Sequence, residues 1–332
     1  MKVGIIGFGH IGRRHSESVM ANPNMELIAV CDPQANSKEL PESVELWENY
    51  KEMIDAHSFD LMIVATPNHL HYEMVDYCLD LGIPTLAEKP LTLNTHEAKL
   101  LHLKQREKNT PLFVNYPLRF LKSINDLKES IDTTVGSPRI LSFNVLWNRN
   151  ENYYESSDWK GTVSMEGGPL FNEFIHHLNL IKYLFGDVSV LGGNVFDFAH
   201  DYTEVEDTGM VVLKMNGGGL GTLTYTVACP NTSFDVDMTV VGDLGCLKLS
   251  GLYFNRVQVE DRITEYPVSL EHFASVLEAV RLNLEEGIED ERLCLIGEAT
   301  NDVALIQSFY SRFDMTNSPK GKHQPMFLKE TF

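Results

Sequence analysis

The 332-residue sequence has no long hydrophobic run, no cysteine pair and few basic residues, and each shortage excludes a class of protein. Its longest apolar runs, such as Leu61 to Ala65, fall far short of the roughly 20 residues that cross a bilayer. The strand pattern starts at the first residues, so we expect no signal peptide and no membrane partner. Five scattered cysteines without a CxxC motif favour a reduced, cytoplasmic protein without a zinc knuckle.

Basic residues are scarce, with 27 lysines and arginines against 47 aspartates and glutamates, and the formal charge is −20. This balance argues against a nucleic-acid partner. It does not exclude an anionic small ligand, because a few amides and cations can hold a phosphate on an otherwise acidic protein. The chain contains no internal repeat or low-complexity stretch, and its length predicts two domains.

The first twelve residues combine an apolar strand pattern with a glycine-rich turn, Gly7-Phe8-Gly9-His10-Ile11-Gly12. Gly7 permits a tight turn, Gly9 lets the backbone approach a pyrophosphate, and Gly12 lets the next helix pack against its strand. A GxGxxG sequence alone is a weak signal, but here Asp32 ends the following apolar run. The opening therefore predicts a dinucleotide-binding unit, whereas a plain glycine turn leaves Asp32 unexplained.

Asp32 also favours NAD over NADP as the cofactor. A carboxylate at the end of the second strand accepts hydrogen bonds from the ribose hydroxyls and repels a 2′-phosphate. The residues Pro33 to Ser37 include no arginine that could bind such a phosphate, although Lys38 is close in sequence.

The first 115 residues or so alternate β-branched runs with amphipathic stretches, which predicts a doubly wound parallel sheet of Rossmann type. From Val188 to Val259, strand-like runs are separated by glycine-rich or polar turns, as in an antiparallel meander. We therefore predict an α/β chain with an NAD-binding domain over residues 1–119. An α+β domain with an open, mainly antiparallel sheet is expected over residues 120–332.

The open sheet is expected to pair with a second copy of the chain, as a homodimer or homotetramer. Its apolar positions include Val211, Leu213, Leu223, Tyr225, Val236, Met238 and Val240.

Two more segments follow expected strands of the parallel sheet, where ligands collect. The first contains Thr66, Pro67, Asn68 and His71, which we assign to cofactor binding; it lacks a carboxylate at a metal-ligand spacing, so no metal site is expected.

The second segment is Glu88-Lys89-Pro90, in which Glu88 and Lys89 are assigned to the cofactor. Lys89 could be a surface lysine before a turn proline. Beside a nicotinamide, its ammonium could instead stabilise the alkoxide that develops as hydride leaves, and a cis bond to Pro90 would redirect it.

Residues 167–179 read as a glycine-hinged entry to a helix on which Asn172, His176 and Asn179 share one face. An imidazole there could take a hydroxyl proton while hydride passes to NAD, although a lone helix histidine is more often structural. His177 points about 100° away and is given the structural role. Arg119 and Lys160 are cations that could hold a phosphate or could be solvated.

Several segments together resemble the Gfo/Idh/MocA oxidoreductases over nearly the whole chain: GFGHIG at 7–12, CDP at 31–33, ATPNHLH at 65–71, AEKP at 87–90 and GGPLFNEFIHHLN at 167–179. The resemblance implies an NAD-dependent dehydrogenase acting on a CH–OH group of a sugar. It also implies that Lys89 and His176 are the catalytic pair. Arg119, Lys160 and Asn172 complete the predicted substrate-binding set.

The helix departs from the family pattern, because Asn172 and Asn179 stand where the family commonly has aspartates. Residues 153–171 resemble the branch that oxidises UDP-N-acetylglucosaminuronic acid at C-3 for bacterial surface polysaccharides. Loss of a carboxylate beside so anionic a substrate is electrostatically reasonable. The alternatives are a dehydrogenase of free sugars or cyclitols and, in another class, a catalytically silent NAD-binding protein.

Overall fold

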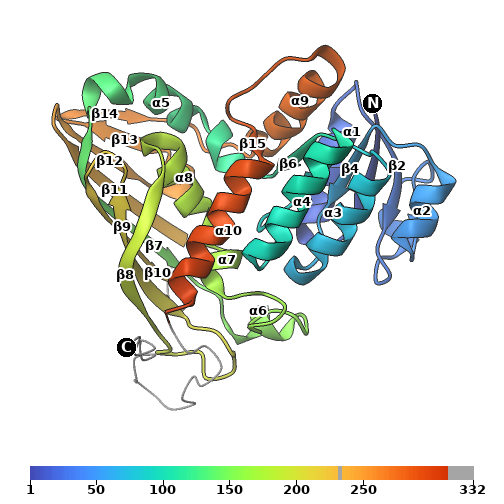
Figure 1. The fold of residues 1–332 in the computed structure, drawn as a ribbon, viewed down its shortest axis with the longest axis horizontal. Coiled ribbons are helices and arrows are strands. Elements are labelled where there is room, and N and C mark those ends of the chain that lie inside the picture. The colour runs from blue at the N-terminus through green and yellow to red at the C-terminus, as the bar shows by residue number, and fades with distance from the viewer. Residues whose placement is uncertain (231–233, 313–332) are drawn as a thin grey trace. The chain divides into compact units, whose positions relative to one another are not determined.

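The protein consists of two compact units in a computed structural model that describes residues 1–230 and 234–312 (Figure 1). The first unit contains Met1–Phe120 and Leu270–Val303, and the second contains Leu121–Ser269 and the chain after Val303. The late segment therefore belongs with the N-terminal part, whereas the sequence analysis assigned everything after residue 119 to one domain. Among the described residues, no helix has both the length and the apolar character needed to cross a membrane.

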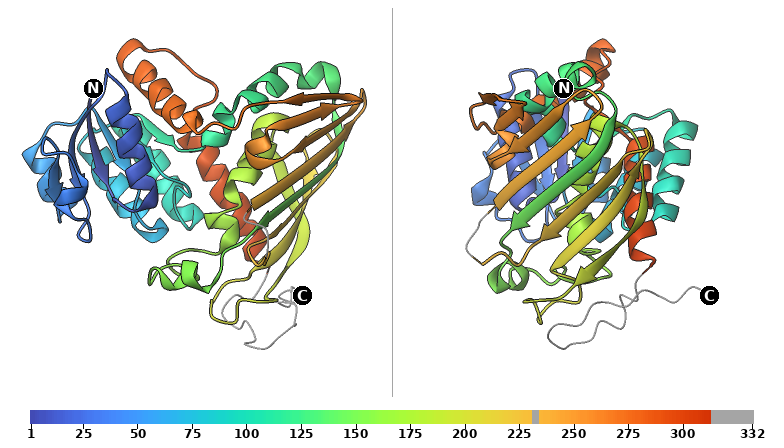
Figure 2. Two further views of the ribbon diagram at one scale, coloured as in Figure 1. Left: turned by 180° about the vertical axis from the view of Figure 1, so that it is seen from behind. Right: turned by 90° about the vertical axis from the view of Figure 1, so that its left-hand side faces the viewer.

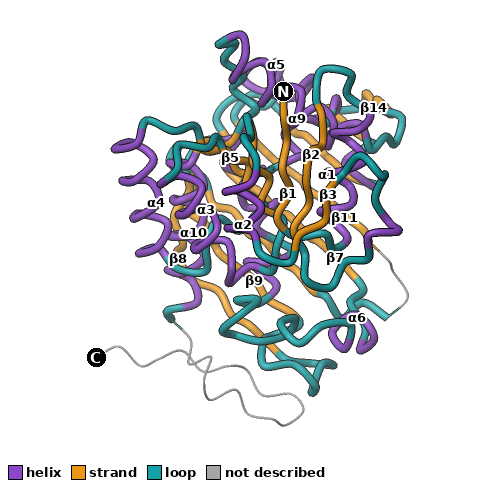
Figure 3. The backbone as a smooth tube through the Cα atoms, turned by 90° about the vertical axis from the view of Figure 1, so that its right-hand side faces the viewer, coloured by secondary structure: helices purple, strands orange, loops and turns teal. Residues whose placement is uncertain are grey.

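A seven-stranded sheet, ordered β3-β2-β1-β4-β5-β6-β15, organises the first unit. Its parallel strands are β1 (Lys2–Ile6), β2 (Glu26–Cys31), β3 (Glu45–Trp47), β4 (Leu61–Val64), β5 (Thr85–Ala87) and β6 (Leu112–Val114). The short β15 (Cys294–Leu295) runs antiparallel to β6. Figure 3 shows β1, β2 and β3 side by side. This order confirms the doubly wound sheet and places its switch point between β1 and β4, where such sheets bind ligands.

Helices connect the parallel strands in sequence. They are α1 (His10–Ala21), α2 (Tyr50–Ala56), α3 (His71–Asp80) and α4 (Thr95–Lys108), with 3-10 turns η1 (Ser37–Glu39), η2 (Asn68–Leu70) and η3 (Pro117–Phe120). Local sequence explains the helix ends: the side chain of Asn94 caps α4 by accepting from the Glu97 N–H, and Asn109 ends it in a left-handed conformation.

Helix α9 (Glu271–Glu286) packs on the first unit through apolar side chains. Val276, Leu277 and Val280 are buried in one core cluster with strand residues such as Val30 and Leu61. Burial of each side chain stabilises the fold by about 1.5–3 kcal/mol.

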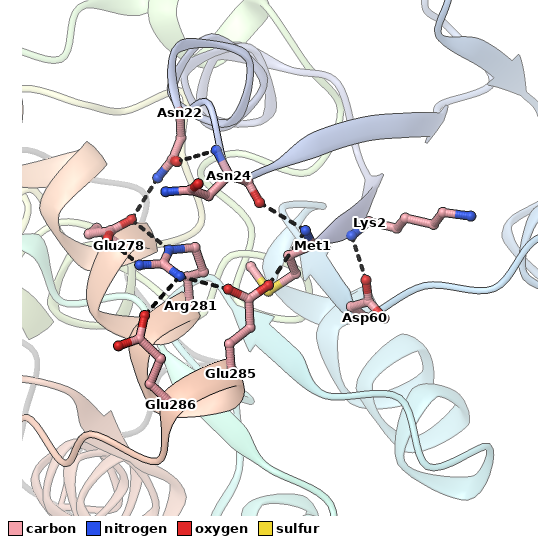
Figure 4. A network of polar contacts seen from close by, with 9 residues as sticks. All are labelled: Met1, Lys2, Asn22, Asn24, Asp60, Glu278, Arg281, Glu285 and Glu286. Carbon is pink, nitrogen blue, oxygen red and sulfur yellow. Dashed lines mark hydrogen bonds and ion pairs between the residues drawn. The ribbon is translucent and has the colours of Figure 1, made fainter.

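A polar network surrounds this contact and joins α9 to the end of α1 (Figure 4). Asn22 donates to Glu278 over 2.8 Å, and Arg281 donates to Glu278, Glu285 and Glu286. The three glutamate side chains are 38–49% exposed, and ion pairs to exposed groups contribute little. The buried apolar residues therefore hold α9, and the polar network sets its orientation.

An eight-stranded sheet, ordered β14-β13-β12-β11-β7-β10-β9-β8, forms the second unit. The strands are β7 (Pro138–Trp147), β8 (Val188–Phe196), β9 (Thr208–Met215), β10 (Leu220–Thr226), β11 (Phe234–Gly242), β12 (Cys246–Ser250), β13 (Arg256–Val259) and β14 (Arg262–Glu265). Only the β10–β7 pair among these neighbours is parallel. The helical segments are α5 (Lys122–Thr134), α6 (Glu151–Glu155), α7 (Pro169–Asn172), α8 (Ile175–Phe185) and the 3-10 turn η4 (Leu252–Phe254). Helix α10 (Ile296–Tyr310) begins in the first unit and ends in the second. The mainly antiparallel sheet predicted for this part of the chain is confirmed.

Within the part of the chain that the structure describes, helices cover one face of this sheet and leave the other uncovered. His177 of α8 contacts the Phe143 ring, and the Phe309 ring of α10 lies against Gly193. Figure 2 (right) shows the opposite face with no helix in front of it.

The apolar positions that the sequence analysis assigned to the open face are buried, and this is a correction. They are Val211, Leu213, Leu223, Tyr225, Val236, Met238 and Val240. Alternation along each strand sends their neighbours to the other face, and most of these are threonine, serine, asparagine or aspartate. One apolar row remains exposed there: Leu220 and Val241 flank Ile140 on adjacent strands.

We predict a homodimer or homotetramer that forms through this uncovered face. Ile140→Glu should weaken assembly, because it places a charge at the centre of an apolar row whose members are 39–58% exposed. Sedimentation of wild type and variant at micromolar concentration measures the effect. Leu103→Glu, on the exposed side of α4, is the matched control. A monomeric wild type would contradict the prediction.

Candidate active site

The glycine turn after β1 is closed toward the protein and open on its other side. Gly7 has φ +94°, and a side chain there would collide with the Ala65 carbonyl. A side chain at Gly12 would collide with the Gly7 carbonyl, whereas no described atom lies within 4 Å of a Cβ built on Gly9. The open side therefore has room for a pyrophosphate.

Helix α1 starts directly at this turn. Its first turn contains His10, Ile11 and Gly12, and the N-cap residue Gly9 offers no side chain to cap it. The first N–H groups of a helix have no partner within the helix and attract an anion. This geometry fits the phosphates of a dinucleotide.

Asp32 lies immediately after β2 and fixes the glycine turn. The Phe8 N–H donates to Oδ2 over 2.7 Å, and the Gln34 N–H donates to Oδ1 over 2.8 Å. Each carboxylate oxygen can accept a second hydrogen bond, so Asp32 can also receive ribose hydroxyls. These observations fit the adenosine ribose of NAD.

Arg13 is a neighbour of this position that the sequence analysis missed. Its guanidinium lies 4.7 Å from the centroid of the Phe8 ring and pairs with Glu39 over 2.8 Å. Arg13 directly follows Gly12 and precedes Asp32 in the sequence, so the lack of an arginine from Pro33 to Ser37 did not reveal it.

The segment after β4 contains the Thr66 hydroxyl and a buried histidine, His71, that lies between two carbonyl groups. The Thr66 hydroxyl is buried and has no hydrogen-bond partner among the described residues, which suits a cofactor contact. Pro67 precedes η2, and Asn68 within it is buried. This part of the segment remains compatible with the predicted cofactor role.

His71, which the sequence analysis assigned to the cofactor, is fully buried. Nε2 lies 2.9 Å from the Thr66 carbonyl oxygen, and Nδ1 lies 2.7 Å from that of Pro90. Burial lowers the pKa of His71 despite these two carbonyls, and a neutral imidazole has only one N–H to donate. The side chain therefore joins the loops after β4 and β5.

Glu88 carries a buried charge at the end of β5. Its Oε1 lies 2.8 Å from His15 Nε2 and accepts from Asn115 Nδ2 over 2.6 Å. Burial is the largest influence and acts to raise the pKa of Glu88, but His15, Lys89 and Asn115 together lower it. The carboxylate is therefore an anion held inside the protein, and its role is to support the turn.

Lys89 follows directly, and its backbone N–H donates to Glu88 Oε2 over 3.3 Å. Its side chain is half-buried, and the Lys89–Pro90 peptide bond is cis. The predicted lysine thus stands beside a buried anion at the carboxyl end of the sheet.

The second unit presents its predicted residues on two short helices. Positive φ values at Gly167 and Gly168 allow the chain to turn into α7. The expected single helix is interrupted, because Asn172 ends α7 and His176 lies in the first turn of α8.

The neighbouring residues of α8 are structural. His177 is buried among aromatic rings that include Phe143 and Phe174, and burial lowers its pKa to about 3. This agrees with the structural role expected of it. Asn179 is also buried.

Buried carboxylates surround Asn172, and the sequence analysis did not find them. Asn172 Nδ2 donates to Glu166 Oε1 over 2.9 Å, and the Gly161 N–H donates to Oε2. Burial, aided by Glu173, raises the pKa of Glu166 to about 8. Burial therefore disfavours the charge of Glu166, while the hydrogen bonds from Gly161 and Asn172 act in the opposite direction.

Tyr153 links Lys160 to Asn172, because it contacts both side chains. Its Nζ is 4.1 Å from the Tyr153 ring centroid and donates to Ser156 Oγ over 2.8 Å, and the Tyr153 hydroxyl contacts Asn172 Nδ2 over 3.3 Å. Arg149, a missed residue, stacks 4.2 Å from the same ring and donates to Glu173 over 2.9 Å. The sequence feature that could have pointed to Arg149 is the close spacing of aromatic and basic residues over 147–160.

Arg119 is placed differently from the expectation. It is 1% exposed and pairs with Glu298 of α10 over 2.8 Å within the first unit. These contacts favour a structural role over the predicted contact with substrate. Within residues 1–230 and 234–312, no group of three histidine, cysteine, aspartate or glutamate side chains could hold a metal ion.

Two models of one protein family match this chain. Residues 1–116 match the oxidoreductase family with an NAD-binding Rossmann fold, GFO_IDH_MocA, and residues 124–248 match the GFO/IDH/MocA C-terminal domain.

Individual relatives are distant in sequence. Myo-inositol 2-dehydrogenase of Thermotoga maritima is 26% identical over 67% of each chain, and scyllo-inositol 2-dehydrogenase (NAD(+)) of Bacillus subtilis is 24% identical over 78% of this chain and 76% of its own. Other relatives are matched over as little as 53% of their length.

The solved structures show the same fold. The WlbA dehydrogenase of Bordetella pertussis, in complex with NADH and UDP-GlcNAcA, superimposes with a TM-score of 0.84 at 21% identity, over 94% of both chains. Since family models match both units and the cofactor turn is intact, the chain is an NAD-dependent oxidoreductase of the Gfo/Idh/MocA family.

Proposed function

We propose that this protein oxidises UDP-N-acetylglucosaminuronic acid at C-3, a step in making bacterial surface polysaccharides. The observation that carries the proposal is the setting of Asn172: an amide stands where the family usually has an acid, and it contacts Tyr153, whose ring holds the cations Arg149 and Lys160. The likeness of residues 153–171 to that branch supports it. So does the fold shared with two WlbA dehydrogenases crystallised with NADH and UDP-GlcNAcA.

The chemistry divides between two side chains acting on one substrate hydroxyl. Bound NAD supplies the hydride acceptor. His176 accepts the hydroxyl proton, and the Lys89 ammonium stabilises the negative charge that develops on the oxygen. The charged Glu88 beside Lys89 favours the ammonium form. The two roles could be exchanged, because a lysine near other cations can also act as a base.

The second candidate is a dehydrogenase of free sugars or cyclitols, which the similarity to two inositol dehydrogenases favours. Mass spectrometry of the ligand that co-purifies with the protein, followed by NADH absorbance with UDP-N-acetylglucosaminuronic acid, myo-inositol and glucose, separates the two. A true ligand at 100 times its Kd should also stabilise the fold by about 2.7 kcal/mol. No NADH with any sugar, for wild type and Lys89→Met alike, would favour a catalytically silent protein.

We predict that NAD binds much more tightly than NADP. Asp32→Ala should narrow this preference, because the variant loses the carboxylate that repels a 2′-phosphate. Calorimetry of both nucleotides gives the ratio of their Kd values, which corrects for any general weakening caused by loss of the bonds to Phe8 and Gln34. Asp55→Ala, an exposed carboxylate in α2, is the control. Equal or tighter binding of NADP to wild type would refute the prediction.

We also predict that Lys89→Ala and His176→Ala each lower kcat by roughly 10² to 10⁴, the usual contribution of a positioned acid or base. NAD affinity should hardly change. Steady-state NADH formation and calorimetry measure the two quantities. Lys122→Ala and His96→Ala, at exposed positions in α5 and α4, should leave both unchanged. A kcat near the wild-type value in His176→Ala would show that His176, and with it α8, takes no part in the reaction.

A further inference from the structure

Four side chains, from Trp147 at the end of β7 to Lys160, form an alternating stack of rings and cations in the second unit. The Arg149 guanidinium lies 4.1 Å from the Trp147 ring centroid and 4.2 Å from that of Tyr153. Lys160 Nζ lies 4.1 Å from the Tyr153 centroid. Cation–ring contacts of this kind hold both cations in fixed positions.

The cations keep hydrogen-bond donors for a ligand. A guanidinium has five N–H donors, and among the described residues Arg149 uses Nε alone, toward Glu173. Its side chain is 24% exposed. Lys160 donates to the Ser156 hydroxyl and the Tyr153 carbonyl, both neutral groups.

The local charge favours an added anion. Burial lowers the pKa of Lys160 and the nearby Arg149 lowers it further, against the opposite effect of Glu173 and Glu166. Among the described residues, Glu173 is the acid that forms an ion pair with Arg149 of the stack. An incoming carboxylate would balance the second cation.

The stack is also linked to the predicted substrate residues. The Tyr153 hydroxyl donates to Glu173 over 3.0 Å and lies 3.3 Å from Asn172 Nδ2. Asn172 is four positions before His176. Because Tyr153 contacts both cations and Asn172, one ligand could reach the stack and Asn172 together.

We propose that Arg149 and Lys160, held on Tyr153, bind the carboxylate of a uronic-acid substrate and so select it over the neutral sugar. The inference rests on the proposed function and adds the residues that read the acid group. The guanidinium of Arg149 can donate two parallel hydrogen bonds to the two oxygens of a carboxylate, and the Lys160 ammonium supplies a positive charge.

Calorimetry on the NADH-loaded protein, which cannot turn over, tests the proposal with UDP-N-acetylglucosaminuronic acid and with UDP-N-acetylglucosamine, which lacks the carboxylate. Arg149→Gln and Lys160→Gln should each raise Kd for the uronic acid by about 10- to 100-fold, as expected for a lost hydrogen bond to a charged group. Kd for the neutral sugar nucleotide should change less than about threefold. Arg262→Gln, at an exposed position of β14, controls for net charge.

Arg149→Gln leaves Glu173 without its cation and could unfold the unit, so two further variants are included. Arg149→Lys keeps the positive charge but loses the paired N–H donors of the guanidinium. Lys160→Gln leaves the hydrogen bond between Arg149 and Glu173 in place. Retention of uronic-acid affinity in folded Lys160→Gln and Arg149→Lys would overturn the proposal. Equal weakening of both sugar nucleotides would also overturn it, because the cations would then bind the shared diphosphate.

Failure of the proposed function gives a different result. If wild type binds neither sugar nucleotide, the same variants are compared with glucuronate and glucose. A preference for glucuronate that disappears in Lys160→Gln would support the carboxylate subsite while rejecting the nucleotide-sugar substrate. No preference in wild type would reject the subsite as well.

Discussion

The negative charge of Glu88, buried at the end of β5, connects three parts of the first unit: α1, the residue after β6 and the backbone of Lys89. His15 comes from α1, directly after the glycine turn, and Asn115 follows β6; both contact the same carboxylate oxygen. Leaving a buried charge without one of its hydrogen-bond partners costs at least about 1–3 kcal/mol. The glycine turn, the sheet and the backbone of Lys89 are therefore held in one arrangement by this interaction.

The second unit handles its buried acids in another way. Glu206 accepts from the hydroxyls of Tyr225 and Tyr310, and burial raises its pKa to about 7. Burial also raises the pKa of Glu166, and Glu173 forms an ion pair with Arg149. Asp207, also fully buried, accepts from the backbone N–H groups of Phe198, Ala199 and His200. The buried acids of the second unit are thus held by tyrosine hydroxyls, by an arginine or by backbone N–H groups.

Local signals predicted much of the first unit, because the glycine turn and Asp32 depend on residues close in sequence. The packing of α9, which lies late in the sequence, against the first unit could not be predicted in this way. It depends on Val276 and Leu277 packing against strands some 200 positions earlier, which no local pattern records.

Alternation was correctly identified in the open sheet, but it does not say which set of side chains faces the helices. The covered face requires α8 and α10, whose positions follow from tertiary contacts such as that of His177 with Phe143. Arg149 and Glu166 were missed for a similar reason. Their significance comes from Tyr153, Glu173 and Asn172, which become neighbours only on folding.

The interrupted course of the first unit limits how the protein can be divided for experiments. A fragment that stops near residue 120 would lack β15 and α9, and it would expose the apolar surface that Val276, Leu277 and Val280 cover. An isolated cofactor unit would need residues 1–120 spliced to 270–303, and the second cut falls inside α10. Exchange of substrate specificity with a relative is therefore better attempted by replacing residues 121–269 as an insert than by joining two halves.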